Sequence, residues 1–271
     1  MKFESRVSWR TMSILAAQMA IVTAATAQAN LDEHHDHAST TKRQVTVVAK
    51  GIYMIRHPDA PDDFPQSNTL VVIGQKSVLV VDSCYLPSAA REDIAQIKTW
   101  TKRPIKYLVN THWHYDHTMG NAEYAKACPG ISIIAHRETL NQSVAYNPQW
   151  FRNYKIRTDA AKTKADSGLD EKGIKLSDED RKAQRDLFEA RTKVWAEFSQ
   201  IKDVHPNRTF DTQMNLDLGG RKVQLLWLGR GNTLGDAVIY LPKERIVAVG
   251  DLADHPSALG SRWMSRQRSI A

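Results

Sequence analysis

The sequence predicts a layered α/β sandwich, on three observations. Short segments rich in β-branched residues occur in two groups, one before residue 136 and one after residue 209. Helical patterns lie between several of these segments, and strands mixed with covering helices in this order are typical of layered α/β folds. The composition, with 42% hydrophobic and 25% charged residues over 271 positions, is that of an ordinary globular domain of enzyme size.

The first 27 residues have the pattern of a cleaved signal peptide. Lys2, Arg6 and Arg10 form a basic head, and residues 11–27 carry no charge. The Ala25-Thr26-Ala27 segment supplies the small residues that signal peptidase recognises, and the apolar run is short for a membrane span. We therefore expect export to the periplasm or the medium, without stable membrane insertion after cleavage; an uncleaved anchor is the alternative.

A polar segment over residues 28–44 follows, with His34, His35 and His37, and is expected to be a flexible N-terminus rather than a metal site. A single large domain is then expected over residues 45–255. Its first strands are expected at residues 45–48, 52–55, 70–73 and 78–81, the last two joined by a hairpin at residues 74–76.

The next segments alternate between helix and buried strand. A helix is predicted over residues 88–100, with Ser88 as its N-cap, and another over residues 119–127. Nearly continuous apolar runs predict buried strands over residues 105–109 and 131–135.

Residues 147–202 predict a helical insertion rather than a separate domain. Ser177 and Asp180 form a capping-box-like start, and apolar residues then recur at helical spacing up to Ile201. Strands are expected to resume at residues 210–218, 222–228, 237–241 and 246–249.

Charge and cysteine content exclude two classes of site. Charges of both signs are mixed along the chain, so the formal net charge of +7 forms no basic stripe, and no nucleic-acid partner is expected. Cys84 and Cys128 are too far apart in sequence for a cysteine zinc motif, and we expect two buried thiols.

The segment Asn110-Thr111-His112-Trp113-His114-Tyr115-Asp116-His117 carries the main chemical signal. It follows the predicted buried strand directly. Alternate residues of an extended chain point the same way, so His112, His114 and Asp116 are expected to converge, with His117 turning in behind them. Packing four titratable groups together without a metal would carry a large desolvation cost, and this mixture of imidazole and carboxylate suits zinc.

This segment resembles the His-x-His-x-Asp-His motif of the metallo-β-lactamase superfamily. Thr111, the Gly120-Asn121 pair, Asp82, residues 229–236 and the Gly250-Asp251 pair also match the family's pattern, in its order. The resemblance implies a four-layer αββα sandwich with the metals at one edge of the two sheets.

The resemblance also implies the role of each residue. His112 and His114 would bind a first metal, Asp116 and His117 a second, and Asp251 would bridge them. Asp82 would orient the histidine loop by hydrogen bonds, although a plain turn residue is the alternative.

Two departures from the family pattern bear on the site. Asn232 stands where the family usually has a histidine ligand; it either binds the first metal weakly or only tolerates a left-handed turn. The family normally continues after the Gly-Asp strand to a last histidine ligand. Here only His255 follows Asp251; we expect it to be a surface-loop residue, and the alternative is that it replaces the missing ligand. Residues 256–271 form a polar basic tail, so the fold is expected to be incomplete at the C-terminus.

The expected function is that of an exported zinc-dependent hydrolase with one or two Zn2+ ions. A metal-bound hydroxide would attack the carbonyl carbon of a small-molecule β-lactam, lactone, ester or thioester, with Asp116 positioning it and moving a proton. A degenerate, non-catalytic metal-binding protein of the same fold is the alternative. An iron oxidoreductase is a weaker third hypothesis, because no flavin-binding partner domain follows.

Overall fold

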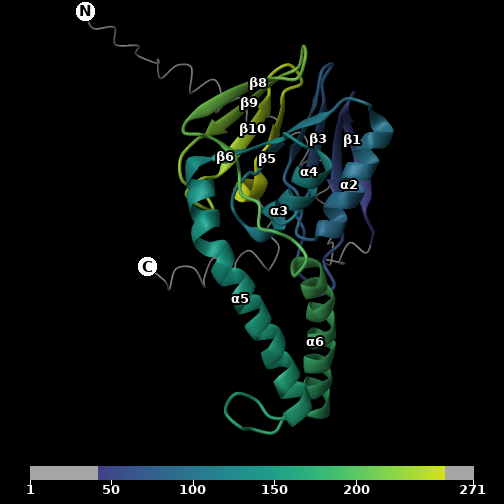
Figure 1. Cartoon of the computed structure of the whole chain (residues 1–271), viewed down its shortest axis with the longest axis vertical. Helices are drawn as coiled ribbons and strands as arrows, with labels where there is room; N and C mark the ends of the chain where they lie inside the picture. The colour runs from purple at the N-terminus through teal and green to yellow at the C-terminus, as the bar shows by residue number, and fades with distance from the viewer. Residues whose placement is uncertain (1–41, 254–271) are drawn as a thin grey trace, which may run out of the picture. The chain divides into compact units, whose positions relative to one another are not determined.

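A computed structural model describes residues 42–253 (Figure 1). The expected signal peptide, most of the polar N-terminal segment, His255 and the basic tail lie outside the described residues. No helix within residues 42–253 is long and apolar enough to cross a membrane.

The first sheet has seven strands in the order of the sequence, β1 to β7. Strands β1 to β4 pair antiparallel, and β4 to β7 pair parallel, as expected once helices connect successive strands. The strands are β1 (Gln44–Ala49), β2 (Ile52–Arg56), β3 (Thr69–Ile73), β4 (Val78–Val81), β5 (Ile105–Val109), β6 (Ser132–His136) and β7 (Arg208–Phe210). The predicted hairpin between the third and fourth strands is confirmed.

The second sheet is antiparallel and has four strands in the order β11-β10-β9-β8. They are β8 (Gln213–Asp217), β9 (Lys222–Trp227), β10 (Ala237–Leu241) and β11 (Ile246–Ala248). Apolar side chains from both sheets form one buried cluster, among them Leu79 and Val81 of the first sheet and Leu225 and Ile239 of the second. The core of the sandwich therefore lies between the sheets.

Helices cover the other face of the first sheet. They are α2 (Pro87–Trp100) and α4 (Asn121–Ala127), and Ile94, Ile97 and Tyr124 pack there against buried residues of β3, β4 and β5. Three layers of the expected αββα sandwich are thus present within the described residues, and the predicted fold class is confirmed.

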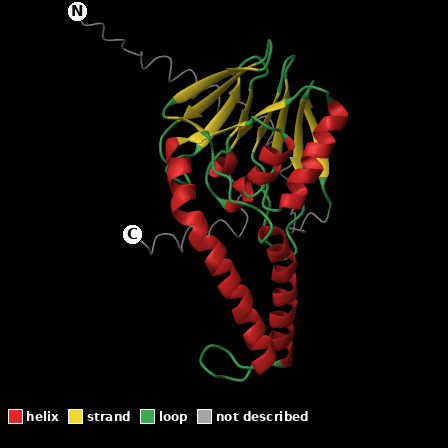
Figure 2. Cartoon of the chain, in the orientation of Figure 1, coloured by secondary structure: helices red, strands yellow, loops and turns green. Residues whose placement is uncertain are grey.

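Two other helices form a hairpin, α5 (Arg137–Ser167) and α6 (Asp178–Phe198), which lie side by side (Figure 2). The helical region begins at Arg137, earlier than the insertion expected from the sequence, and α5 continues through Pro148. The predicted start of the second helix is confirmed, because the Ser177 side chain accepts a hydrogen bond from the backbone N–H of Asp180.

Several predicted boundaries were wrong. Leu86, not Ser88, is the N-cap of α2, because Pro87 occupies the first helical turn and Ser88 hydrogen-bonds to Glu197 instead. The strand expected over residues 210–218 is two strands in different sheets, since the chain bends between Phe210 and Gln213. The helix expected from residue 119 begins at Asn121 and is preceded by a separate short helix, α3 (Tyr115–Thr118).

Candidate metal centre

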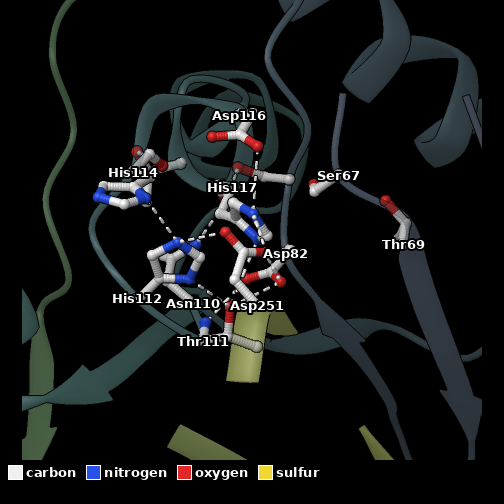
Figure 3. A network of polar contacts seen from close by, with 12 residues as sticks. Ser67, Thr69, Asp82, Asn110, Thr111, His112, His114, Asp116, His117 and Asp251 are labelled. Carbon is white, nitrogen blue, oxygen red and sulfur yellow. Dashed lines mark hydrogen bonds and ion pairs between the residues drawn. The ribbon is translucent and has the colours of Figure 1, made fainter. Parts of the chain in front are cut away.

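The candidate site lies where the parallel strands of the first sheet end. Asp82 directly follows β4, and the histidine segment directly follows β5. The carboxyl ends of parallel strands meet at one edge of a sheet, which is the usual place for a site in α/β folds. Figure 3 shows Asp82, His112, His114, Asp116, His117 and Asp251 gathered at this edge.

The strand ends at Val109, residues 111–113 are bends, and His114 is the N-cap of α3, so the extended alternation expected from the sequence is absent. Asp116 lies inside that short helix, so a helical turn sets its direction. The Trp113 ring packs against the rings of His114, Tyr115 and Tyr146, at 4.7, 5.6 and 5.0 Å between centroids.

One group of donors comprises His112, His114 and Asp251, whose ligand atoms all lie within 4.8 Å of one another. His112 Nε2 is 3.0 Å from His114 Nδ1 and 3.2 Å from Asp251 Oδ2. Burial, reinforced by the neighbouring His112, lowers the pKa of His114 to about 3, so this imidazole is neutral at physiological pH. A neutral imidazole is the form that binds metal.

A second group comprises Asp116, His117 and Asp251. His117 Nε2 lies 3.2 Å from Asp116 Oδ2 and 3.2 Å from Asp251 Oδ1. Although burial opposes the charged form, Asp116 and Asp82 raise the pKa of His117 well above its ordinary value. Hydrogen bonds from His112 and His117 outweigh burial and hold the pKa of Asp251 below its usual range. Asp251 therefore faces both groups as a carboxylate.

Asp82 orients two of the histidines, as the resemblance implies. Its Oδ1 accepts from the Thr111 backbone N–H at 2.8 Å, and its Oδ2 lies 2.9 Å from Thr111 Oγ1 and 2.8 Å from His117 Nδ1. Since the Thr111 hydroxyl donates its proton to Asp82, it accepts from His112 Nδ1 at 3.1 Å. Nδ1 of His112 donates to the Thr111 hydroxyl and Nδ1 of His117 donates to Asp82, so both Nδ1 atoms carry a proton. The Nε2 atom of each ring then faces the other side chains of the candidate metal centre.

Buried amides and a hydroxyl fix the loop behind the histidines. Asn110 Nδ2 donates to the His117 carbonyl and to Asn121 Oδ1, and Ser83 Oγ also donates to Asn121 Oδ1. Sequence reasoning matched Asn121 only as part of a flanking pattern and assigned nothing to Asn110 or Ser83. Their sequence signal is weak, because buried asparagines that bind backbone carbonyls follow no local spacing.

Asn232 reaches the same cluster. Its Nδ2 donates to Asp251 Oδ2 at 3.3 Å, and the turn that carries it is held by Asp236, which accepts from the backbone and hydroxyl of Thr233. The alternative that Asn232 is needed for a left-handed turn is wrong: among the described non-glycine residues, only Asp63, Asp82, Cys84 and Arg245 have positive φ.

The donor set fits a divalent metal ion. Imidazole nitrogens and carboxylate oxygens converge, and the outer ring atoms of His112 and His117 are occupied by Thr111 and Asp82, as they are in metal-binding histidines. The carboxylates of Asp82, Asp116 and Asp251 lie together at this edge, and a bound cation would neutralise part of their negative charge.

The family model of the metallo-beta-lactamase superfamily matches residues 62–254. The fold is also similar to that of a metallo-beta-lactamase from Pontibacter korlensis, at 18% identity, covering 76% of this chain and 70% of that one, with a TM-score of 0.49. A metallo-beta-lactamase from Hirschia baltica matches at 13% identity, with coverages of 76% and 69% and a TM-score of 0.46. A double mutant of the sec-alkyl sulfatase PisA1, from Pseudomonas sp., matches at 16% identity, with coverages of 77% and 31% and a TM-score of 0.50. On the family match over most of its length, the chain belongs to the metallo-beta-lactamase superfamily.

Proposed function

We propose that this protein is a zinc-dependent hydrolase that uses water to cleave the bond between an acyl carbon and its leaving group. The observation that carries the proposal is the convergence of His112, His114 and Asp251, with His117 and Asp116 beside them, under the orienting bonds of Asp82. Superfamily members such as β-lactamases and the alkyl sulfatase are metallo-hydrolases, which agrees with this reaction class.

The clustered side chains provide ligands for two metal ions. His112 and His114 would hold a first metal ion and Asp116 and His117 a second, with Asp251 available to both; imidazole and carboxylate are common zinc donors. Bound zinc lowers the pKa of a coordinated water to about 7 and so supplies a nucleophile at neutral pH.

Asp116 is the residue placed to handle a proton. Its carboxylate is partly open to solvent, with 17% of the side chain exposed, and His117 outweighs burial to keep the pKa of Asp116 below its usual range. It is therefore an ionised proton acceptor that solvent can reach, and it would position the attacking water and then move its proton to the leaving group.

The substrate class proposed is a small acyl compound, namely a β-lactam, lactone, ester or thioester. The basic, apolar and small-residue order of residues 1–27 supports export of the protein to the periplasm or the medium. N-terminal sequencing of the exported fraction is expected to find a start near Gln28; Met1 on membrane-bound protein would contradict export.

Asn232 supports a second candidate, a metal-binding protein of the same fold without catalysis. An amide oxygen is a weaker zinc donor than imidazole, and the Asn232 amide is engaged with Asp251.

His114→Ala is expected to remove most metal from the first group of donors and to abolish hydrolysis of acyl substrates. The reason is that His114 Nδ1 is one of only three donor atoms in that group. Elemental analysis of the purified variants, followed by a panel of β-lactam, lactone, ester and thioester substrates, measures both effects.

Trp113→Phe is the matched control, because Trp113 contacts the His114 ring but offers no metal ligand, and phenylalanine keeps an aromatic ring in that place. It should retain its metal. Equal metal loss in both variants would contradict the proposed arrangement, whereas a metal-loaded wild type without any hydrolytic activity would favour the non-catalytic alternative.

A further inference from the structure

Three other side chains that could bind a metal ion lie outside the candidate metal centre. His57 follows β2, Cys84 lies two residues beyond Asp82 after β4, and Asp93 lies on α2. All three are buried, with exposed fractions of 3%, 0% and 0%. Their donor atoms converge: Cys84 Sγ is 3.5 Å from His57 Nε2 and 3.6 Å from Asp93 Oδ2, and His57 Nε2 is 3.1 Å from both Asp93 oxygens.

The hydrogen bonding of His57 requires a cation beside its Nε2. His57 Nδ1 lies 2.9 Å from the Ser67 carbonyl oxygen, which only accepts, so Nδ1 carries a proton. Nε2 then faces a carboxylate, and a bare lone pair in that position would be repelled. Either a proton or a metal ion must therefore lie between His57 Nε2 and Asp93.

Each of the three donors also has an outer partner. Arg43 donates to Asp93 Oδ1 from Nη2 at 2.7 Å and from Nε at 3.2 Å, and Thr69 Oγ1 lies 3.3 Å from Cys84 Sγ. Together with the Ser67 carbonyl on His57, these contacts reproduce the outer support that metal ligands have in proteins.

We propose that His57, Cys84 and Asp93 form a second, closed site for a divalent, thiolate-binding metal ion of the zinc class. Ligands of a tetrahedral zinc lie roughly 3.3–3.7 Å apart, given bond lengths of about 2.0–2.3 Å. The observed separations of 3.1–3.6 Å are close to that range. Imidazole, thiolate and carboxylate are all common zinc donors.

Binding replaces the thiol proton. Two bonds to hydrogen break, Cys84 S–H and His57 Nε2–H; both protons leave to solvent, and Sγ–metal and Nε2–metal bonds take their place. Compared with a proton on His57, a divalent ion bound to the thiolate leaves the cluster with the same net charge. The metal therefore adds a bond to sulfur without adding buried charge.

The role of this site is structural. Its ligands come from the ends of β2 and β4 and from α2, so a metal here would tie the covering helix to the first sheet. All three ligands are buried, so no substrate could reach a metal held there.

Cobalt(II) substitution tests the proposal, because a cobalt–thiolate bond gives a charge-transfer absorption that nitrogen and oxygen ligands do not. Protein produced in zinc-depleted, cobalt-supplemented medium takes up the ion while it folds, so the buried site needs no entry path. We expect the thiolate band in the wild type and its loss in Cys84→Ser, with metal content lower by about one ion per chain. Cys128→Ser is the matched control and should keep the band.

Two outcomes would overturn the site: a cobalt-loaded wild type without a thiolate band, or a band that depends on Cys128. The wild-type spectrum decides the matter even if Cys84→Ser fails to fold. His114→Ala separates this site from the proposed hydrolase centre, since it should lose metal from that centre while the thiolate band remains.

Discussion

Asp82→Ala is expected to lower the free energy of unfolding by about 3–5 kcal/mol, as for other buried charged groups whose partners are left behind. Asp82 is 3% exposed and accepts from the Thr111 backbone, the Thr111 hydroxyl and His117. Without it, the buried Thr111 N–H has no acceptor and the His117 imidazolium loses one of its carboxylates. Urea unfolding of the variant and the wild type measures the difference.

The same substitution should weaken metal binding by about 10- to 100-fold, because His112 and His117 both lose the contacts that fix their protonated nitrogens. Asp82→Asn separates the loss of stability from the loss of metal affinity. Asparagine has the same shape and keeps one oxygen acceptor, so the free energy of unfolding should fall less than in Asp82→Ala. Its amide N–H would still face a donor of Thr111 or His117, so metal binding should remain weakened. Asp211→Ala is the control, since its pair with Arg137 is solvent-exposed and its removal should leave the free energy of unfolding almost unchanged. An Asp82→Ala variant as stable as Asp211→Ala would show that the loop holds its shape without Asp82.

Asn232→His is expected to raise metal affinity by about 10- to 100-fold, the range in which changes around a metal site act. The Asn232 side chain already reaches Asp251 Oδ2, which lies 3.2 Å from His112 Nε2, so an imidazole in this turn would be directed at the first group of donors. Imidazole is a better zinc ligand than an amide oxygen. Chelator-competition titration of the two proteins measures the change.

Asn232→Ala supplies the comparison, because it removes the hydrogen bond to Asp251 without adding a donor. Affinity should then rise only in the histidine variant. Unchanged affinity in a folded Asn232→His protein would exclude position 232 from the metal centre and leave Asn232 as a residue that steadies Asp251.

Local patterns predicted much of the fold and of the candidate site. The β-branched runs located every strand of the first sheet except β7, and the His-x-His-x-Asp-His motif located four of the clustered side chains within six residues. Both succeed because strand formation and ligand spacing are local properties of the sequence.

Features that depend on distant contacts were not predicted. The bend between Phe210 and Gln213, which moves the chain from one sheet to the other, leaves no break in the run of strand-forming residues. The His57, Cys84 and Asp93 cluster has no local motif either, because its members come from three elements that only the tertiary fold brings together. Cys128 was expected to be buried but is partly exposed at the end of α4, since the helix ends there beside a surface turn.

Asp82 and Cys84 share one further property, a backbone in the left-handed region, with φ of 60° and 69°. Each such residue costs of the order of 1–3 kcal/mol when it is not glycine. Glycine would relieve the strain at either position, yet it would delete the carboxylate that orients the histidines or the thiol of the second cluster. Glycine substitutions, which stabilise many turns of this kind, would therefore remove a side chain that the site uses. The protein keeps an unfavourable backbone conformation at Asp82 and Cys84, and stability is lower here because the two side chains are retained.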